Sequence, residues 1–442
     1  MSRPGPAVNR TAPDPDAVPL AVGAELHDAG DPHLDRAGPA DPVFLPEGTA
    51  MADEALAGAA YRRLLEPVRL GELELPNRIA MAPMTRSFCG EDGVPGPEVV
   101  AYYAARAAAG TGLIITEGTV VDMGPARGYR GVPGLCSDVQ QAAWARVTDA
   151  VHAAGARIAV QLWHAGRLAH SRANGGCTPL APSAVTAAGP YIDFADPETY
   201  GAGLDYAPPR AMTESDIESV IDAFARAAVR AQHAGFDAIE FHGGSGYLIQ
   251  QFWNADSNRR DDDFGGDVWR RGEFASRLVA AVRAAVGPKM PLVMQLAQFA
   301  VNDFGWTTWQ TPDELATTLG RLVEAGCDGF YASAHRISTP AFGAAADPAQ
   351  RSLAWHMRCI TSRPVIAVGG VTYSAPVQQT LAGTPAPVED PINAVTALEQ
   401  GDADIVAIGR AMIANPDWVR LVSAGRWREL APFSRELLMT LR

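Results

Sequence analysis

Residues 137–167 read SDVQQAAWARVTDAVHAAGARIAVQLWHAGR, and this stretch holds one complete helix–strand unit. Ser137 is a favourable N-cap for a helix predicted over 138–154, and the Ala-Gly pair at 154–155 suits a left-handed C-cap. The apolar run Arg157–Trp163 then predicts a strand buried on both faces. A helix that ends in glycine just before a buried strand is the repeating unit of parallel α/β proteins.

The same unit recurs along the chain from about Ala59 onward. Thr213 opens a second predicted helix, which runs to Ala234, and Thr311-Pro312 opens a third. An open doubly wound sheet would need a glycine-rich turn after the first strand, and residues 81–85 provide none. We therefore predict a closed (β/α)8 TIM barrel with elaborated C-terminal-face loops. Its eight predicted strands are Arg78–Pro83, Gly112–Glu117, Arg157–Trp163, Ala238–His242, Leu292–Leu296, Gly329–Ser333, Pro364–Val368 and Asp404–Ile408.

The first part of the chain has a different composition. Residues 1–50 are rich in Pro, Ala, Gly and Asp, which predicts disorder, or else an over-long start assignment ahead of Met51. We divide the chain into an N-terminal extension, 1–58, and a barrel, 59–442. No continuous apolar segment follows Arg3, so we expect no signal peptide.

Composition excludes several classes of function. The formal net charge is −14, which disfavours binding to nucleic acid or to an anionic membrane surface. No apolar run reaches the roughly 18 residues of a transmembrane helix. The cysteines are scattered and form no CxxC motif, so we expect no metal site and no disulfide framework, and we expect a cytoplasmic protein. They are Cys89, Cys136, Cys177, Cys327 and Cys359.

Polar residues gather where the predicted strands end, which is where barrel enzymes place their active sites. Gly369-Gly370 and Gly409-Arg410 follow the last two strands and match a phosphate site, because glycine lets backbone N–H groups approach and arginine adds a charged fork. Two long loops, 168–210 and 335–356, follow the third and sixth strands and are expected to shape the site.

Six motifs, in one order along residues 61–442, resemble those of the old yellow enzyme family. They are MAPMTRS (81–87), ITEGT (115–119), QLWHAGR (161–167), HGGSGYLIQQF (242–252), NRRDDDFGG (258–266) and IGRAMIANPD (408–417). The resemblance implies FMN at the barrel mouth and NADH or NADPH as reductant. The cofactor-binding residues that it implies are Ala82, Pro83, Met84, Thr85, Gly118, Gln161, His242, Gln295, Gly369, Gly370, Gly409 and Arg410.

The implied reaction is reduction of the alkene of a small α,β-unsaturated carbonyl compound. Reduced FMN supplies a hydride, and donors at the carbonyl oxygen stabilise the developing negative charge. The resemblance makes Tyr247 the proton donor, with His242 and Ser245 at the substrate oxygen. A tyrosine two residues beyond Ser245 can reach the opposite face of the substrate as general acid.

Two positions depart from the family pattern. The family pairs histidine with asparagine or histidine three residues later, whereas this chain has Ser245, a shorter donor. The family usually has arginine at the end of strand five, whereas this chain has the neutral Gln295. Losing that charge could favour dehydrogenation or a redox-neutral isomerisation.

Four hypotheses for the function therefore remain open. The first is an ene-reductase, and the second is an atypical flavin enzyme of the same fold. The third is a barrel that binds a ligand without turnover. The fourth, the dienoyl-CoA or amine-oxidising branch of the barrel, is disfavoured because no cysteine follows Cys359 and the chain stops about 30 residues past Arg410. The sequence leaves the substrate and any homo-oligomer open.

Overall fold

The computed structural model describes residues 58–191, 193, 204–381 and 383–442. The predictions for residues 1–50 therefore lie outside the described residues. Eight parallel strands close into a barrel in the order β3-β4-β5-β8-β9-β10-β11-β12. The prediction of a (β/α)8 barrel is confirmed, and every predicted strand overlaps an observed one. The bounds are β3 Ile79–Met81, β4 Leu113–Val120, β5 Arg157–Trp163, β8 Ala238–Phe241, β9 Leu292–Ala297, β10 Gly329–Ser333, β11 Val365–Val368 and β12 Ile405–Ile408.

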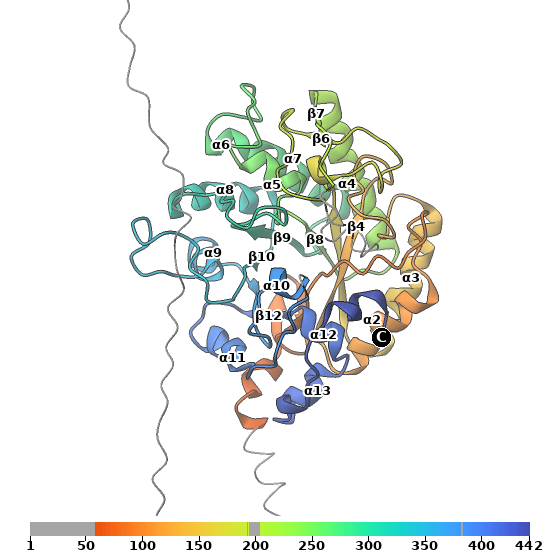
Figure 1. Cartoon of the computed structure of the whole chain (residues 1–442), viewed down its shortest axis with the longest axis vertical. Helices are drawn as coiled ribbons and strands as arrows, with labels where there is room; N and C mark the ends of the chain where they lie inside the picture. The colour runs from red at the N-terminus through yellow and green to blue at the C-terminus, as the bar shows by residue number, and fades with distance from the viewer. Residues whose placement is uncertain (1–57, 192, 194–203, 382) are drawn as a thin grey trace, which may run out of the picture. The chain divides into compact units, whose positions relative to one another are not determined.

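Helices surround this barrel (Figure 1). Ser137 caps α3 in a reciprocal capping box with Gln140, and Thr213 caps α4 in the same way with Asp216. None of the described helices is long and apolar enough to cross a membrane. The helices are α2 Pro97–Ala108, α3 Asp138–Ala153, α4 Glu214–His233, α5 Leu248–Trp253, α6 Val268–Arg271, α7 Glu273–Val286, α8 Pro312–Ala325, α9 Leu353–Thr361, α10 Val377–Leu381, α11 Ile392–Glu399, α12 Arg410–Ala414 and α13 Trp418–Ser423, with 3-10 turns η1 Arg62–Leu65, η2 Gly166–Leu168, η4 Trp427–Glu429 and η5 Arg435–Met439.

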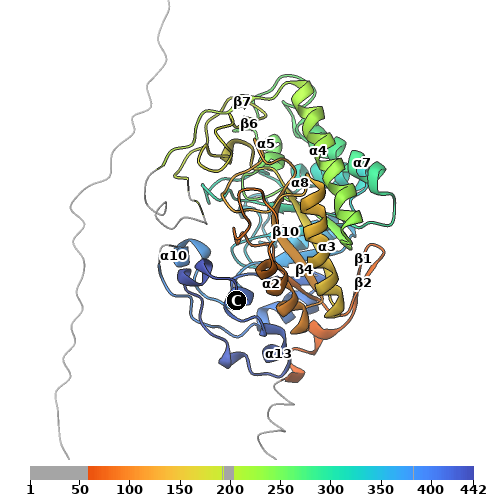
Figure 2. The same ribbon diagram turned by 90° about the vertical axis from the view of Figure 1, so that its right-hand side faces the viewer.

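The barrel has a packed interior and a closed floor. Alternate strand residues, such as Ala80, Ala159 and Val293, form an apolar cluster inside the barrel. Leu70 and Leu75 join that cluster from the hairpin of β1 Val68–Leu70 and β2 Leu73–Leu75. Figure 2 shows this hairpin on the opposite side of the barrel from α10. The open mouth is therefore the carboxyl end of the strands, where the sequence predicted the site.

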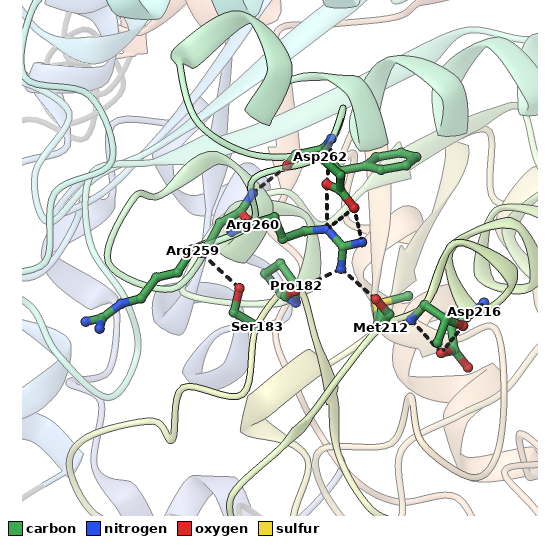
Figure 3. A network of polar contacts seen from close by, with 10 residues as sticks. Pro182, Ser183, Met212, Asp216, Arg259, Arg260 and Asp262 are labelled. Carbon is green, nitrogen blue, oxygen red and sulfur yellow. Dashed lines mark hydrogen bonds and ion pairs between the residues drawn. The ribbon is translucent and has the colours of Figure 1, made fainter.

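Arg260 fixes the insertion 168–210 at both of its ends. Its two short strands, β6 Leu180–Ala181 and β7 Arg210–Ala211, pair with each other. Immediately after them, the carbonyl oxygens of Pro182 and Met212 accept hydrogen bonds from Arg260, at 3.0 and 2.6 Å. Figure 3 shows this guanidinium also bonded to Asp262. The NRRDDDFGG motif thus serves here as a clamp on the insertion.

Candidate active site

A cavity of about 250 Å³ lies at the carboxyl ends of the strands. The residues that line it lie at the end of, or just after, β3, β8, β9, β10, β11 and β12. The walls of the cavity thus come from segments that are far apart in the sequence. The predicted site residues that line it are Ala82, Pro83, Met84, His242, Ser245, Gln295, Gly369, Gly370, Gly409 and Arg410. The topology thus brings together ten positions that were predicted from five separate strand ends.

The glycine pair after β11 allows a close backbone approach at the cavity rim. Gly369 and Gly370 have φ values of 137° and 51°, and a Cβ on Gly369 would lie 2.3 Å from the carbonyl oxygen of Ala334. A side chain is therefore excluded at Gly369. A Cβ on Gly409 would meet nothing nearer than the Met84 sulfur at 3.6 Å, so this glycine faces the cavity.

Arg410 adds a positive charge beside these glycines. Its guanidinium donates to the Thr380 hydroxyl at 2.9 Å and to the Ala375 carbonyl at 2.8 Å, and lies 5.8 Å from the centre of the Tyr373 ring. These contacts hold the cation at the edge of the cavity that Arg410 itself lines. Backbone N–H groups beside an arginine are the usual elements of a phosphate site.

The segment His242 to Gly246 makes a tight turn over strand β9. A Cβ on Gly243 would lie 2.5 Å from the Gln295 carbonyl oxygen, so only glycine fits there. Ser245 has a left-handed φ of 57°, and its carbonyl oxygen accepts from Val301 N at 2.9 Å. Burial lowers the pKa of His242 to about 3, so the imidazole is neutral at pH 7. This turn directs His242 and Ser245 to the cavity.

The Nδ1 atom of His242 is buried and has no hydrogen-bond partner among the described residues. A buried nitrogen of this kind is normally satisfied, so its position beside the cavity indicates a bound group that supplies the partner.

Tyr247 packs against His242, with ring centres 4.6 Å apart and planes at 73°. Its hydroxyl lies 2.8 Å from the hydroxyl of Tyr129, which comes from the loop after β4. Burial raises the pKa of Tyr247, so its hydroxyl keeps its proton at neutral pH, while the bond to Tyr129 partly offsets that rise. Trp163 completes this aromatic cluster, 5.1 Å from Tyr247 and 5.5 Å from Tyr129.

Gln295 occupies the predicted place on strand five, inside the barrel and at the cavity wall. Its Oε1 atom accepts a hydrogen bond of 3.0 Å from Gln161 Nε2, which comes from β5. Gln161 pairs in register with Gly118 across a β-bulge in β4. This bond couples two of the predicted flavin-binding residues directly.

Thr85, Gly118, Gln161 and Tyr247 do not line the cavity themselves. Gln161 is bonded to Gln295 and Tyr247 packs on His242, and both of these partners line the cavity. Gly118 lies beside Gln161 in the sheet. Thr85 follows Met84, which does line it.

Sequence reasoning also missed several residues of the cavity wall. The rings of Phe299 and His335 pack in a tilted arrangement with their centres 4.7 Å apart, and the Phe304 ring lies 5.4 Å from His335. Tyr331 of β10 and Tyr373 line the cavity as well. His335 belongs to the loop 335–356, which was expected to shape the site. Tyr331 falls in a predicted strand, and the alternation of that strand could have assigned it to the interior.

Comparison with known proteins identifies the family. The model of the NADH:flavin oxidoreductase / NADH oxidase family matches residues 63–429. The chain belongs to this family. The flavin oxidoreductase hxnT of Emericella nidulans is 35% identical over 380 residues, which cover 82% of this chain and 90% of the relative. The resemblance stated from the motifs is thereby confirmed, and the chain is an NAD(P)H:flavin oxidoreductase of the old yellow enzyme family.

Solved structures agree with this assignment. Morphinone reductase in complex with tetrahydroNAD has a TM-score of 0.68 and 33% identity, covering 82% of this chain and 91% of that one. The old yellow enzyme homologue from Zymomonas mobilis has a TM-score of 0.68 and 30% identity, covering 85% and 96% respectively.

The cavity of this flavin oxidoreductase fits a flavin phosphate and ring. Gly409 lets the backbone reach the cavity with only Met84 and Ala82 in ordinary contact range, and Gly369 keeps the backbone near the rim. Arg410 supplies a cation, and the buried Nδ1 of His242 has no hydrogen-bond partner among the described residues. Ala82 and Met84 offer an apolar surface on which a flat ring can lie.

Proposed function

We propose that this flavin oxidoreductase uses FMN to reduce the alkene of a small α,β-unsaturated carbonyl compound. The observation that carries the proposal is the arrangement of Tyr247: its hydroxyl is paired with Tyr129 at 2.8 Å, and its ring packs on His242, which lines the cavity. A proton donor and a neutral hydrogen-bonding group thus stand together at the mouth of a flavin-type barrel.

FMN rather than FAD is the proposed cofactor. Gly369, Gly370, Gly409 and Arg410 would hold its phosphate, and Ala82, Pro83, Met84, Thr85, Gly118, Gln161 and Gln295 would contact its ring. When bound, FMN supplies the hydride that it receives from NADH or NADPH.

The residues of the chain have separate tasks in this proposal. His242 and Ser245 hold the carbonyl oxygen and stabilise its developing negative charge, as donors in an oxyanion site do. For His242 to donate, its neutral ring must carry the proton on the nitrogen that faces the oxygen. Tyr247 gives its proton to the α-carbon, and Tyr129 positions the Tyr247 hydroxyl.

A second candidate is altered flavin chemistry, namely dehydrogenation or redox-neutral isomerisation. The observation that favours it is the neutral pair of Gln161 and Gln295, which leaves the cavity wall at strand β9 without a cation. An arginine there would stabilise the charge that a flavin gains on reduction.

The test begins with the flavin itself. Heat denaturation should release FMN from the purified or reconstituted protein, and release of FAD or failure to bind flavin would contradict the proposal. Anaerobic titration with NADH and with NADPH should bleach the flavin, and 2-cyclohexen-1-one should then reoxidise it. Bleaching without reoxidation by any of a panel of enones would favour the second candidate.

A further inference from the structure

Glu240 is a buried carboxyl group that the proposed reaction does not use. It lies on β8, two residues before His242, and only 1% of its surface is exposed. Ala238, two residues earlier on the same strand, belongs to the apolar cluster inside the barrel, so Glu240 also faces the interior. It therefore lies beneath the cavity that His242 lines.

The surroundings of Glu240 are neutral. Neither carboxylate oxygen has a hydrogen-bond partner among the described residues, and no described cation forms an ion pair with it. Gln161 is its partner in the register of β5, and Val293 is its partner on β9. Tyr331 of β10 interacts with it electrostatically. The neutral His242 lies two residues further along the chain, and it lines the cavity together with Gln295 and Tyr331.

A charged carboxylate is costly in such a place, because no cation pairs with it and the Gln161 amide replaces only part of the lost water. Burial raises the pKa of Glu240 to about 8, although the nearby Gln161 amide lowers it in part. The Tyr331 hydroxyl is affected in turn, since burial first and then the Glu240 carboxylate raise its pKa. At neutral pH the carboxyl group is therefore in its protonated form.

We propose that Glu240 is a positioning residue which, by keeping its proton, holds the floor of the flavin site neutral and so permits the flavin to be reduced. This inference rests on the proposed function, because it assumes that the cavity binds FMN. Reduction adds negative charge to a flavin, and an ionised carboxylate in the same water-poor barrel would oppose that charge. With Gln295 in place of a cation, the proton on Glu240 is what prevents the conflict.

The experiment measures the reduction potential of bound FMN between pH 6 and pH 10 in the wild type and in Glu240→Gln. The two potentials should run in parallel below pH 7. At higher pH the wild-type potential should fall further, until oxidised flavin is favoured about tenfold more than in the variant, or about 30 mV for a two-electron couple. Asp402→Asn is the matched control, because burial also raises the pKa of Asp402 but this residue lies outside the cavity.

Each outcome decides the matter. Parallel curves over the whole pH range, with FMN bound in both proteins, would overturn the role of Glu240 and leave the proposed function intact. Failure of the wild type to bind FMN would overturn both. If Glu240→Gln does not fold, Gln295→Arg is the second test: a cation on the neighbouring strand should draw the proton from Glu240. The pH range in which the flavin potential falls more steeply should then lie at least one pH unit lower than in the wild type, and an unchanged range would overturn the proposal.

The infrared spectrum gives a readout that needs no flavin. The wild type at pH 7 should show the carbonyl stretch of protonated carboxyl groups, and this band should be weaker in Glu240→Gln, where the buried Glu117, whose pKa burial raises to about 7, still contributes. Identical bands in the two proteins would show that Glu240 is ionised and would overturn the inference.

Discussion

Replacing Glu240 by glutamine should flatten the pH dependence of the protein's stability. Burial raises the pKa of this carboxyl from its ordinary value of 4.5 to about 8, so the folded chain binds the proton more tightly than the unfolded chain. Because the folded pKa is the raised one, the stabilising contribution is complete below about pH 4.5 and is lost as the pH rises to about 8. At 1.36 kcal/mol per pKa unit, the loss approaches about 5 kcal/mol.

The assay is the thermal midpoint of the flavin-free protein between pH 5 and pH 9. For a barrel of this length, about 5 kcal/mol corresponds to roughly 6 °C. The wild type should lose that much relative to Glu240→Gln as the pH rises. Packing of the amide can shift the whole curve by a constant amount, so the test is how the difference between the two curves changes with pH. Glu399→Gln, which changes an exposed glutamate on α11, is the charge-matched control and should follow the wild type. Parallel curves for the wild type and Glu240→Gln would refute the reasoning.

Further predictions concern the site and the N-terminal extension. In stopped-flow measurements, Tyr247→Phe should slow reoxidation of the flavin by an enone by about 10²- to 10⁴-fold, while reduction by NAD(P)H stays within a few fold. Tyr129→Phe should slow the same step by about two- to tenfold, the cost of one hydrogen bond, and equal losses in both steps would make the tyrosines structural. Gln295→Arg should raise the flavin potential and speed its reduction several-fold, since a cation about 4 Å away gains on the order of 4 kcal/mol before desolvation. An unchanged potential would place Gln295 away from the flavin. Adding Ser245→Asn should tighten the binding of phenols, and titration with a phenol measures this. A chain that starts at Met51 should keep its flavin and melt within about 5 °C of the full chain; a larger drop would show that the extension contributes to stability.

The barrel could be predicted because its signals are local. A capping residue such as Ser137, a left-handed glycine such as Gly155 and a continuous apolar run each act within a few residues. Because all eight strands run parallel, their carboxyl ends lie at one face of the closed barrel, which is why His242, Gln295 and Arg410 meet at one cavity. The extra length of β4 was not predicted, since its bulge between Ile115 and Gly118 depends on pairing with β5.

The finer chemistry of the site depends on contacts between distant segments. Tyr129 and Tyr247 are 118 residues apart, and their hydroxyls meet only because a loop after β4 folds over Trp163. The bond between Gln161 and Gln295 likewise joins two strands that are not neighbours in the sheet. Glu240 is different: its even spacing from His242 on one strand was visible in the sequence, and alternation alone would have assigned it to the barrel interior.

The Arg260 clamp has a consequence for how such a protein can change over time. Because one guanidinium holds the chain just after β6 and just after β7, both ends of the intervening segment stay in place whatever lies between them. Closing a longer loop between fixed ends costs little, since each doubling of its length adds only about 0.6 kcal/mol. Segments of different length could therefore be exchanged here by recombination without disturbing the strands, provided that they keep the buried Tyr191 and Tyr206, because Tyr191 stacks on Tyr129 beside the site. The exposed part of this stretch is thus a suitable place for loop libraries.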